Sequence, residues 1–397
     1  KIHRDPLSPS SPDKSRQPMT QSAPGKITNI QGLRGLAALL VFVAHLVGGE
    51  RDYGGGPQTL LPSFLEIGVT GVDLFFVISG FVMVYVTWPA SQFSNSGKTS
   101  SALRRQMALK FLTRRISRIY PFYWFVTALL LLLYGGKYVL FGEATPLHAP
   151  VRAFLLFPAD ALPIVPVGWT LIHEMYFYLV MALALVLPLR LLPGVLLLWG
   201  SGIAIAYGAG LHTTNAWTMV IVSPLTYEFL LGAAVAFLTL KGITHHAGPV
   251  LVIALCWLVC LLGPLGGALF PDAVTNHGIR TLIFAMPFAL LVYAAVGLEW
   301  RLDWQVPRWA GALGDASYAL YLVHIPVFLV VGKLIDRFTG PGLVDNGVLI
   351  VAFCVATFAA TAVTHLYVEK PLIAWSRRLL ASRSAQDPNA PQSQSAY

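Results

Sequence analysis

Long apolar segments with few charged residues recur between residues 31 and 368, and they are the strongest constraint on how this chain folds. A helix of roughly 20 apolar residues spans the hydrocarbon core of a bilayer. Only 11% of the residues are charged, whereas soluble domains carry about 25%. The segments are long and lack the period of two that is typical of a membrane β-barrel. The sequence therefore predicts an all-α fold, a polytopic transmembrane helical bundle.

The apolar segments divide the chain into about ten expected spans. They cover residues 31–48, 67–87, 119–140, 167–188, 193–211, 217–240, 248–270, 279–297, 313–333 and 347–368. Residues 149–165 are apolar but interrupted by proline, so a re-entrant or interfacial loop is expected there. Residues 1–26 and 381–397 are polar and are expected to be disordered tails on either side of a transmembrane domain at 27–380.

Basic residues collect in alternate loops between the expected spans. The densest group, between the second and third spans, comprises Lys98, Arg104, Arg105, Lys110, Arg114, Arg115 and Arg118. The positive-inside rule assigns such loops to the cytoplasm, so both termini are expected there. The formal net charge of +9 then reflects topology and contact with anionic membrane lipids, and no nucleic-acid partner is expected. The oligomeric state is left open.

An arginine and a histidine share one face of the first span. Arg34 and His45 are close to three helical turns apart, which separates their Cα atoms by roughly 16 Å along the axis. With the N-terminus in the cytoplasm, Arg34 lies on the inner side and His45 lies beyond the midplane. Arginines near helix ends often reach lipid headgroups, and lone histidines often serve packing. A functional interpretation therefore depends on which other groups share their depth.

Two carboxylates are expected at the depth of His45. Asp73 in the second span and Glu174 in the fourth each lie roughly 6 Å outside the helix midpoint, against about 7 Å for His45. Glu228 lies nearer the midplane. Ionisable groups inside a membrane are costly and tend to be functional, so this layer predicts an acid–base site. Which carboxylate pairs with the histidine stays open.

Other polar or small residues in the spans have simpler interpretations. His324 and His365 are interpreted as hydrogen-bonded packing residues, and Arg280, near an outer helix end, as a membrane anchor. Gly80 is expected to permit close helix packing. No cluster has the spacing of a metal site, so neither a metal nor a permanently bound cofactor is expected.

Six motifs follow one another along the chain. The first is Arg34-GLAALLVFVA-His45, and the others are GVDLFFVISGF (71–81), FLTRRISRIYPFYW (111–124), GWTLIHEMYFYL (168–179), LGDASYALYLVHIP (313–326) and YVEKP (367–371). In sequence and order they resemble the acyltransferase-3 family of integral-membrane O-acyltransferases, over nearly all of residues 28–380. The fourth motif is most similar to members that modify bacterial exopolysaccharides.

The resemblance implies transfer of an acyl group, commonly acetyl or succinyl, from cytoplasmic acyl-CoA to a sugar hydroxyl. The acceptor would be an exopolysaccharide, a lipid-linked glycan or a related glycoside, and the location the bacterial inner membrane. Acyl-CoA would be a donor substrate. Because a guanidinium group pairs well with phosphate, the donor's phosphates are assigned to the inner arginines. These are Arg34, Arg114, Arg115 and Arg118.

His45 is expected to act as the general base on the acceptor hydroxyl, a role suited to an imidazole of unperturbed pKa about 6.5. Glu174 or Asp73 would orient the ring and stabilise the imidazolium. The sequence contains no G-x-S-x-G nucleophile elbow, so direct transfer is favoured over a covalent acyl-enzyme.

The alternative function is a proton-coupled transporter or flippase of a glycan or lipid intermediate, in which the same buried charges form a path. Such proteins are typically built from internal repeats with paired Gly- or Pro-broken helices. Neither feature is found in this sequence, which favours the enzyme.

Overall fold

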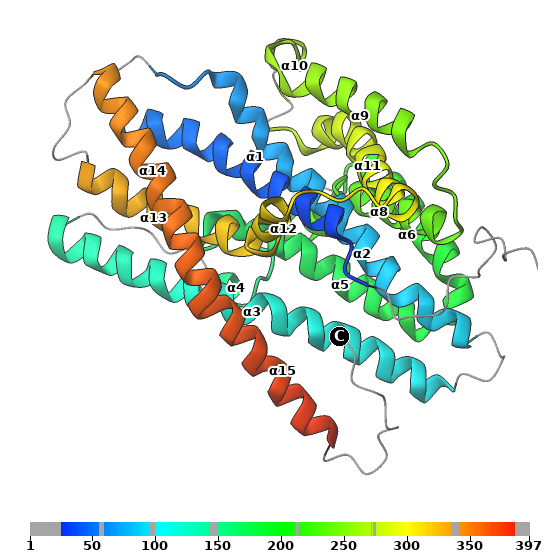
Figure 1. Ribbon diagram of the computed structural model, residues 1–397. Coiled ribbons are helices and arrows are strands. Elements are labelled where there is room, and N and C mark those ends of the chain that lie inside the picture. Colours follow the sequence, from blue (N-terminus) through cyan, green and yellow to red (C-terminus); the bar gives the residue numbers. More distant parts are fainter. Residues whose placement is uncertain are drawn as a thin grey trace, which may run out of the picture.

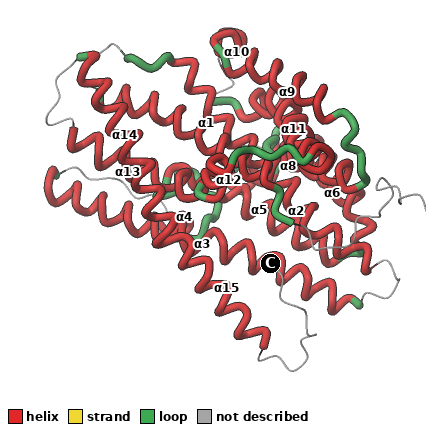
Figure 2. Tube along the Cα trace, in the orientation of Figure 1, coloured by secondary structure: helices red, strands yellow, loops and turns green. Residues whose placement is uncertain are grey.

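The computed structural model describes residues 25–54, 59–94, 100–142, 150–211, 214–270, 272, 275–335 and 342–385. All regular secondary structure in these residues is helical (Figures 1 and 2), as the sequence predicts. A helix satisfies its backbone hydrogen bonds within its own segment, which a spanning structure in lipid requires. Most of the expected tails, residues 1–24 and 386–397, lies outside the described residues.

The long helices carry most of the apolar sequence. They are α1 (Thr28–Tyr53), α2 (Gly71–Ser94), α3 (Ser101–Phe141), α5 (Trp169–Val186), α6 (Leu192–Gly208), α8 (Thr226–Leu240), α9 (Ala247–Leu262), α11 (His277–Leu302), α13 (Ser317–Ile335), α14 (Leu343–Thr364) and α15 (Lys370–Ala385). The short helices are α4 (Pro150–Phe154), α7 (Ala216–Ile221), α10 (Pro264–Leu269) and α12 (Arg308–Asp315). Ser63–Thr70, Pro166–Gly168 and Leu189–Leu191 are 3₁₀ segments, and His365–Glu369 is a π-helical turn.

Nine helical segments of the described chain are long and apolar enough to cross a membrane, and α9 is a shorter apolar helix. Together they correspond to the ten expected spans. The expected seventh span, 248–270, is divided at Gly263, because Pro264 begins a new helix, α10. Residues 150–165 contain only the short α4 and form no span, as expected.

Two helices extend further than the sequence suggests. α3 has 41 residues, a length of roughly 60 Å, about twice the hydrocarbon core. Apart from Lys98, which lies outside the described residues, the basic residues expected in a loop therefore lie on its first half. α14 continues through the π-helical turn into α15, which ends at Ala385, past the expected domain boundary at 380. Figure 1 shows α15 beside the first half of α3, where Ser376 Oγ donates to Ser117 O at 3.2 Å.

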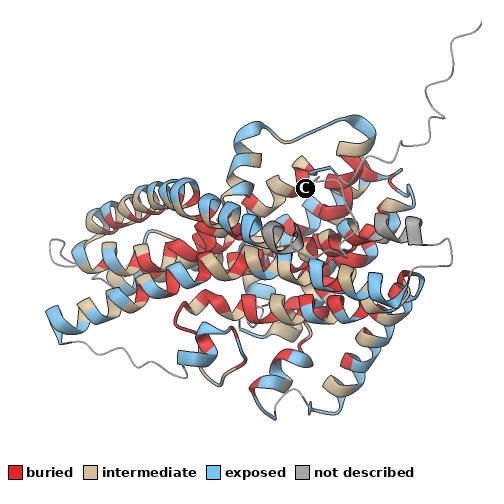
Figure 3. Ribbon diagram, turned by 90° about the horizontal axis from the view of Figure 1, so that it is seen from below, coloured by how far each residue is buried: buried red, intermediate tan, exposed pale blue. Residues whose placement is uncertain are grey.

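The buried residues gather along the centre of the bundle, and the exposed ones lie on its outside (Figure 3). α2 contacts α1, α5, α8 and α11, while α1 also contacts α12, α13 and α14. α2 and α11 are the most buried of the long helices in the described chain, and α1 joins them to α12, α13 and α14.

The contact between α2 and α8 depends on glycine. A Cβ atom on Gly80 would lie 1.9 Å from Phe229 O, and one on Gly232 would lie 1.9 Å from Val77 O. No side chain fits at either position, so the two backbones approach one another directly. This confirms the packing role expected for Gly80.

A buried polar network joins α2, α8 and α11. Arg280 Nε donates to Asp73 Oδ1 at 3.0 Å, and Thr281 Oγ1 donates to Glu228 Oε1 at 2.8 Å. Asp73 and Glu228 are 0% exposed and Arg280 is 2% exposed. The interpretation of Arg280 as a membrane anchor is therefore wrong, because its charge is compensated inside the protein.

Replacing Gly232 by leucine is expected to push α8 away from α2, at a cost of about 1–3 kcal/mol or more. The melting temperature of the detergent-solubilised protein should fall, as measured by heating followed by size-exclusion chromatography. Gly202→Leu is the matched control, since Gly202 is an exposed glycine of α6 with nothing within 4 Å of its Cβ position. Equal melting temperatures for the two variants would contradict a glycine-dependent contact.

Asp73→Asn is expected to destabilise the fold, because it leaves the buried Arg280 charge uncompensated, at a cost of about 3–5 kcal/mol. Thermal unfolding measures this loss, with the exposed Asp52→Asn as control. The double variant Asp73→Leu/Arg280→Met should recover stability, because it removes both charges. A stable but inactive Asp73→Asn protein would instead assign Asp73 to the chemistry.

Candidate functional site

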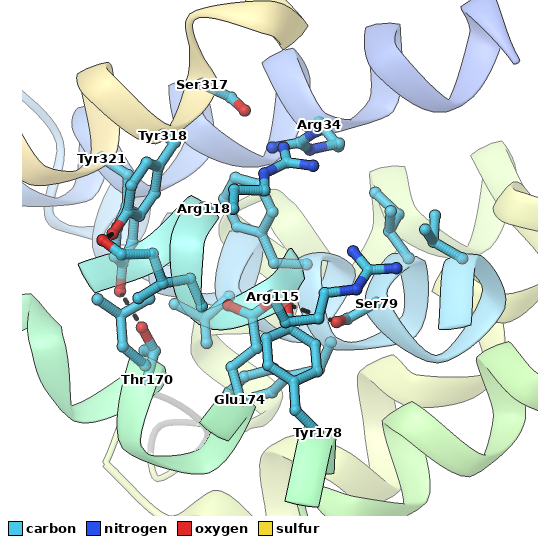
Figure 4. A pocket seen from close by; sticks show the side chains of 17 residues that line it. Arg34, Ser79, Arg115, Arg118, Thr170, Glu174, Tyr178, Ser317, Tyr318 and Tyr321 are labelled. Carbon is cyan, nitrogen blue, oxygen red and sulfur yellow. Dashed lines mark hydrogen bonds between the residues drawn. The ribbon is translucent and has the colours of Figure 1, made fainter. Parts of the chain in front are cut away.

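Five helices surround a cavity that is lined by three of the four arginines assigned to the donor. α1 contributes Arg34, and α3 contributes Arg115 and Arg118, one turn apart on the same helix face. The remaining polar lining comes from α2, α5 and α13 and comprises Ser79, Thr170, Glu174, Tyr178, Ser317, Tyr318 and Tyr321 (Figure 4). We call this space the arginine cavity.

Three guanidinium groups and one carboxylate line the arginine cavity. Glu174 Oε1 accepts hydrogen bonds from Ser79 Oγ, at 3.2 Å, and from the Tyr178 hydroxyl. In the part of the chain that the structure describes, no carboxylate forms an ion pair with Arg34, Arg115 or Arg118. The cavity therefore keeps an excess of positive charge, which suits an anionic ligand.

Aromatic rings and a neighbouring amide hold two of the arginines. The Arg115 guanidinium lies 5.4 Å from the centroid of the Phe111 ring and 5.5 Å from that of Tyr178. Arg34 Nη1 donates to Gln31 Oε1 at 3.3 Å. Such contacts orient a guanidinium without neutralising it.

Arg114, the fourth arginine assigned to the donor, lies outside the arginine cavity. It is exposed, whereas Arg115 is half-buried. Adjacent residues of a helix diverge by about 100°, so the two side chains leave α3 in different directions.

His45 lies in a second cavity, which we call the histidine cavity. Its other polar lining residues are Arg51, Asp52, Tyr53, Glu66 and Tyr134. His45 Nδ1 is 2.9 Å from Val41 O, the carbonyl one turn earlier in α1. Because a carbonyl only accepts, the neutral ring carries its proton on Nδ1, and Nε2 keeps its lone pair.

Neither candidate carboxylate pairs with His45. Asp73 is bonded to Arg280, and Glu174 lies in the arginine cavity, bonded to Ser79 and Tyr178. The expected pairing of His45 with Glu174 or Asp73 is therefore wrong, and the reason is physical. A common depth gives residues the same level in the bundle, but the rotation of each helix about its axis decides which neighbour a side chain meets.

The residue that does contact the His45 ring is His324 of α13. The two ring centroids are 4.9 Å apart at an interplanar angle of 65°. From the sequence alone, only a packing role is expected for His324. Its position one turn after Tyr321, within the motif at 313–326, is the signal that places it next to a cavity-lining residue.

Aromatic rings link residues that line the two cavities. Phe75 and Tyr321 line the arginine cavity, and their ring centroids are 5.9 Å apart. The Tyr321 ring lies 6.3 Å from His324, which contacts His45. The Tyr321 hydroxyl is held at 2.8 Å from Thr170 Oγ1. A continuous series of ring contacts therefore leads from one cavity to the other.

Comparison with known proteins gives a consistent family assignment. Residues 27–366 match the acyltransferase domain of the acyltransferase-3 family. The exopolysaccharide production protein ExoZ of Rhizobium meliloti (strain 1021) is 31% identical over 337 residues, covering 81% of this chain and 96% of ExoZ. The acyltransferase MdmB of Streptomyces mycarofaciens is 24% identical over 410 residues, covering 91% of this chain and 96% of MdmB. No solved structure matches significantly.

The family domain covers most of the chain and coincides with the apolar helical bundle. Both cavities are lined by residues within it. With the motifs, the helices and the relatives in agreement, this chain belongs to the acyltransferase-3 family and is a multi-pass membrane O-acyltransferase.

Proposed function

We propose that the protein transfers an acyl group, acetyl or succinyl, from cytoplasmic acyl-CoA to a sugar hydroxyl of an exopolysaccharide or a lipid-linked glycan. It acts in the bacterial inner membrane, with both termini in the cytoplasm. The observation that carries this proposal is the excess positive charge of Arg34, Arg115 and Arg118 in the arginine cavity. The name of ExoZ, which refers to exopolysaccharide production, supports a polysaccharide acceptor.

The donor is an anionic nucleotide on a long, thin arm, and the arginine cavity suits both parts. Guanidinium groups bind the phosphates. The cavity holds about 100 Å³, which suits a thin arm and is too small for a whole nucleotide. Glu174 belongs to this donor site, where it holds Ser79 and Tyr178. Other exposed basic residues add long-range attraction for an anionic donor: Arg105 and Lys110 on α3, and Arg377 and Arg378 on α15.

The acceptor enters the histidine cavity, which lies further along α1 from Arg34. The Nε2 lone pair of His45 takes the proton of the acceptor hydroxyl as that oxygen bonds to the acyl carbon. The bond from the acyl carbon to the CoA sulfur then breaks, and the imidazolium returns its proton to the thiolate. The ester and free CoA are the products.

The purified protein in lipid nanodiscs tests this function directly. Incubation with radiolabelled acetyl-CoA or succinyl-CoA and bacterial exopolysaccharide or its lipid-linked precursor should give labelled glycan. Absence of label with both donors and both acceptors would contradict the proposal, and movement of a fluorescent lipid-linked glycan across vesicles without acylation would favour the transporter.

Arg115→Ala is expected to weaken CoA binding roughly tenfold or more, the worth of one hydrogen bond to a charged group. Isothermal titration calorimetry with CoA measures this change, and Arg34→Ala should behave alike. Arg114→Ala is the matched control, because this neighbouring arginine is exposed outside the cavity. An acyl-pantetheine donor, which lacks the nucleotide, should lose little in the variants. Equal losses with both donors would mean that these arginines do not contact phosphate.

His45→Ala is expected to lower kcat by about 10²–10⁴-fold, the usual contribution of a general base, while CoA affinity stays unchanged. Transfer of radiolabel and calorimetry with CoA give the two measurements. His246→Ala, which removes an exposed histidine, serves as the control. A His45→Ala protein with more than half of the wild-type rate would exclude His45 as the base.

A further inference from the structure

We propose that His324 is a positioning residue for His45, because its neutral ring provides the acceptor lone pair beside His45 while His45 carries a proton. This inference rests on the proposed role of His45 as general base. It assigns a function in the reaction to a histidine of α13 that the residue pattern alone attributes to packing.

The two rings are held in contact by their own helices. His45 Nδ1 is 2.9 Å from Val41 O, and His324 Nδ1 is 3.1 Å from Leu320 O. In both cases the carbonyl belongs to the residue one turn earlier and can only accept, so each neutral ring is protonated on Nδ1. Each Nε2 atom then keeps a lone pair. At 4.9 Å between centroids, the two rings are in contact.

The Nε2 atom of His324 is an exception to the usual pairing of buried polar atoms. His324 is 0% exposed, and this atom has no hydrogen-bond partner among the described residues. Buried polar side-chain atoms are generally hydrogen-bonded, and exceptions require an explanation such as a catalytic role. A phenylalanine would be enough for packing alone. The neighbouring Phe328 plays such a role, with its ring centroid 5.8 Å from that of His324.

No carboxylate performs this task for His45 in the described structure. Of the acidic residues that line the histidine cavity, Glu66 is paired with Arg51 at 2.8 Å and Asp52 is exposed. The expected partners, Glu174 and Asp73, are bonded elsewhere. His324 is the side chain that contacts the ring.

The proton balance of the reaction is unchanged by this role. The acceptor hydroxyl gives its proton to His45 Nε2, the new C–O bond forms, the C–S bond breaks, and the proton passes to the thiolate. His324 gains and loses no proton. Its lone pair stabilises the imidazolium electrostatically while that cation exists, without accepting either of its protons, and its ring limits how far the His45 ring can tilt.

Three substitutions of His324 separate this role from packing. In His324→Gln the amide reaches the position of Nε2 and keeps an acceptor there. In His324→Asn the shorter amide lies at the position of Nδ1 and keeps only the contact with Leu320 O. In His324→Phe the ring remains without any lone pair. Kinetics with radiolabelled acetyl-CoA and exopolysaccharide give kcat and KM, and calorimetry with CoA confirms a folded donor site.

His324→Phe and His324→Asn are expected to lose roughly tenfold in kcat, because a partial negative charge close to the imidazolium interacts with it at an effective dielectric constant of about 20. KM for acetyl-CoA should be unchanged, and His324→Gln should recover most of the loss. The same three substitutions at His173, whose Nδ1 also faces a carbonyl one turn earlier, are the matched control and should leave kcat unchanged.

A His324→Phe protein as fast as, or faster than, His324→Gln would overturn the proposal and leave His324 with packing alone. His45→Ala, measured in parallel, identifies which idea has failed. If His45→Ala is inactive while His324→Phe is normal, only the inference about His324 is lost. If His45→Ala is itself active, the general base of the proposed function is lost as well.

Discussion

The cost of placing a charge in a low-dielectric helical bundle governs the polar architecture of this protein. The charge of Arg280 is compensated by an ion pair with Asp73 at 3.0 Å, buried between α2 and α11. The charges in the arginine cavity are only partly compensated, because three guanidinium groups line it and only one carboxylate does. One set of charges is balanced within the protein, whereas the other has an excess of positive charge that the proposed anionic donor would balance.

This contrast bears on how the enzyme is organised around its donor. Arg34 and His45 lie on one helix, and the bundle gives each its own cavity. Ring contacts connect the residues that line them, from Phe75 and Tyr321 in the arginine cavity to His324 and His45. In the proposed reaction the thioester passes these rings to reach His45, and the sugar hydroxyl reaches His45 from the histidine cavity. Water-soluble donor and glycan acceptor thus need no common entrance.

Much of the fold follows from segment length and hydropathy, because a helix in lipid must satisfy its own backbone. The sequence could not reveal the full extent of α3, since its basic first half lowers hydropathy although Arg, Lys and Leu are good helix formers. The sequence correctly predicted that Arg34, Arg115 and Arg118 lie close together, because all three are expected near the cytoplasmic side of the membrane and belong to the first and third motifs. It misassigned Glu174 and Asp73 because helical rotation is set by tertiary packing, here by contacts such as that of Gly80 with Phe229. The contact of His324 with His45 could not be predicted for the same reason, because it depends on the rotation of α13 relative to α1.

The uninterrupted length of α3 has a consequence for how sequences of this kind can diverge. Arg118 lines the arginine cavity and Tyr134 lines the histidine cavity, and both belong to this one helix. Inserting or deleting a single residue between them would turn one side chain by about 100° relative to the other. The stretch between these residues can therefore change its amino acids but not its length. A change of length in a connecting loop would leave this relation unchanged, so the continuous α3 fixes the orientation of one cavity's lining relative to the other's.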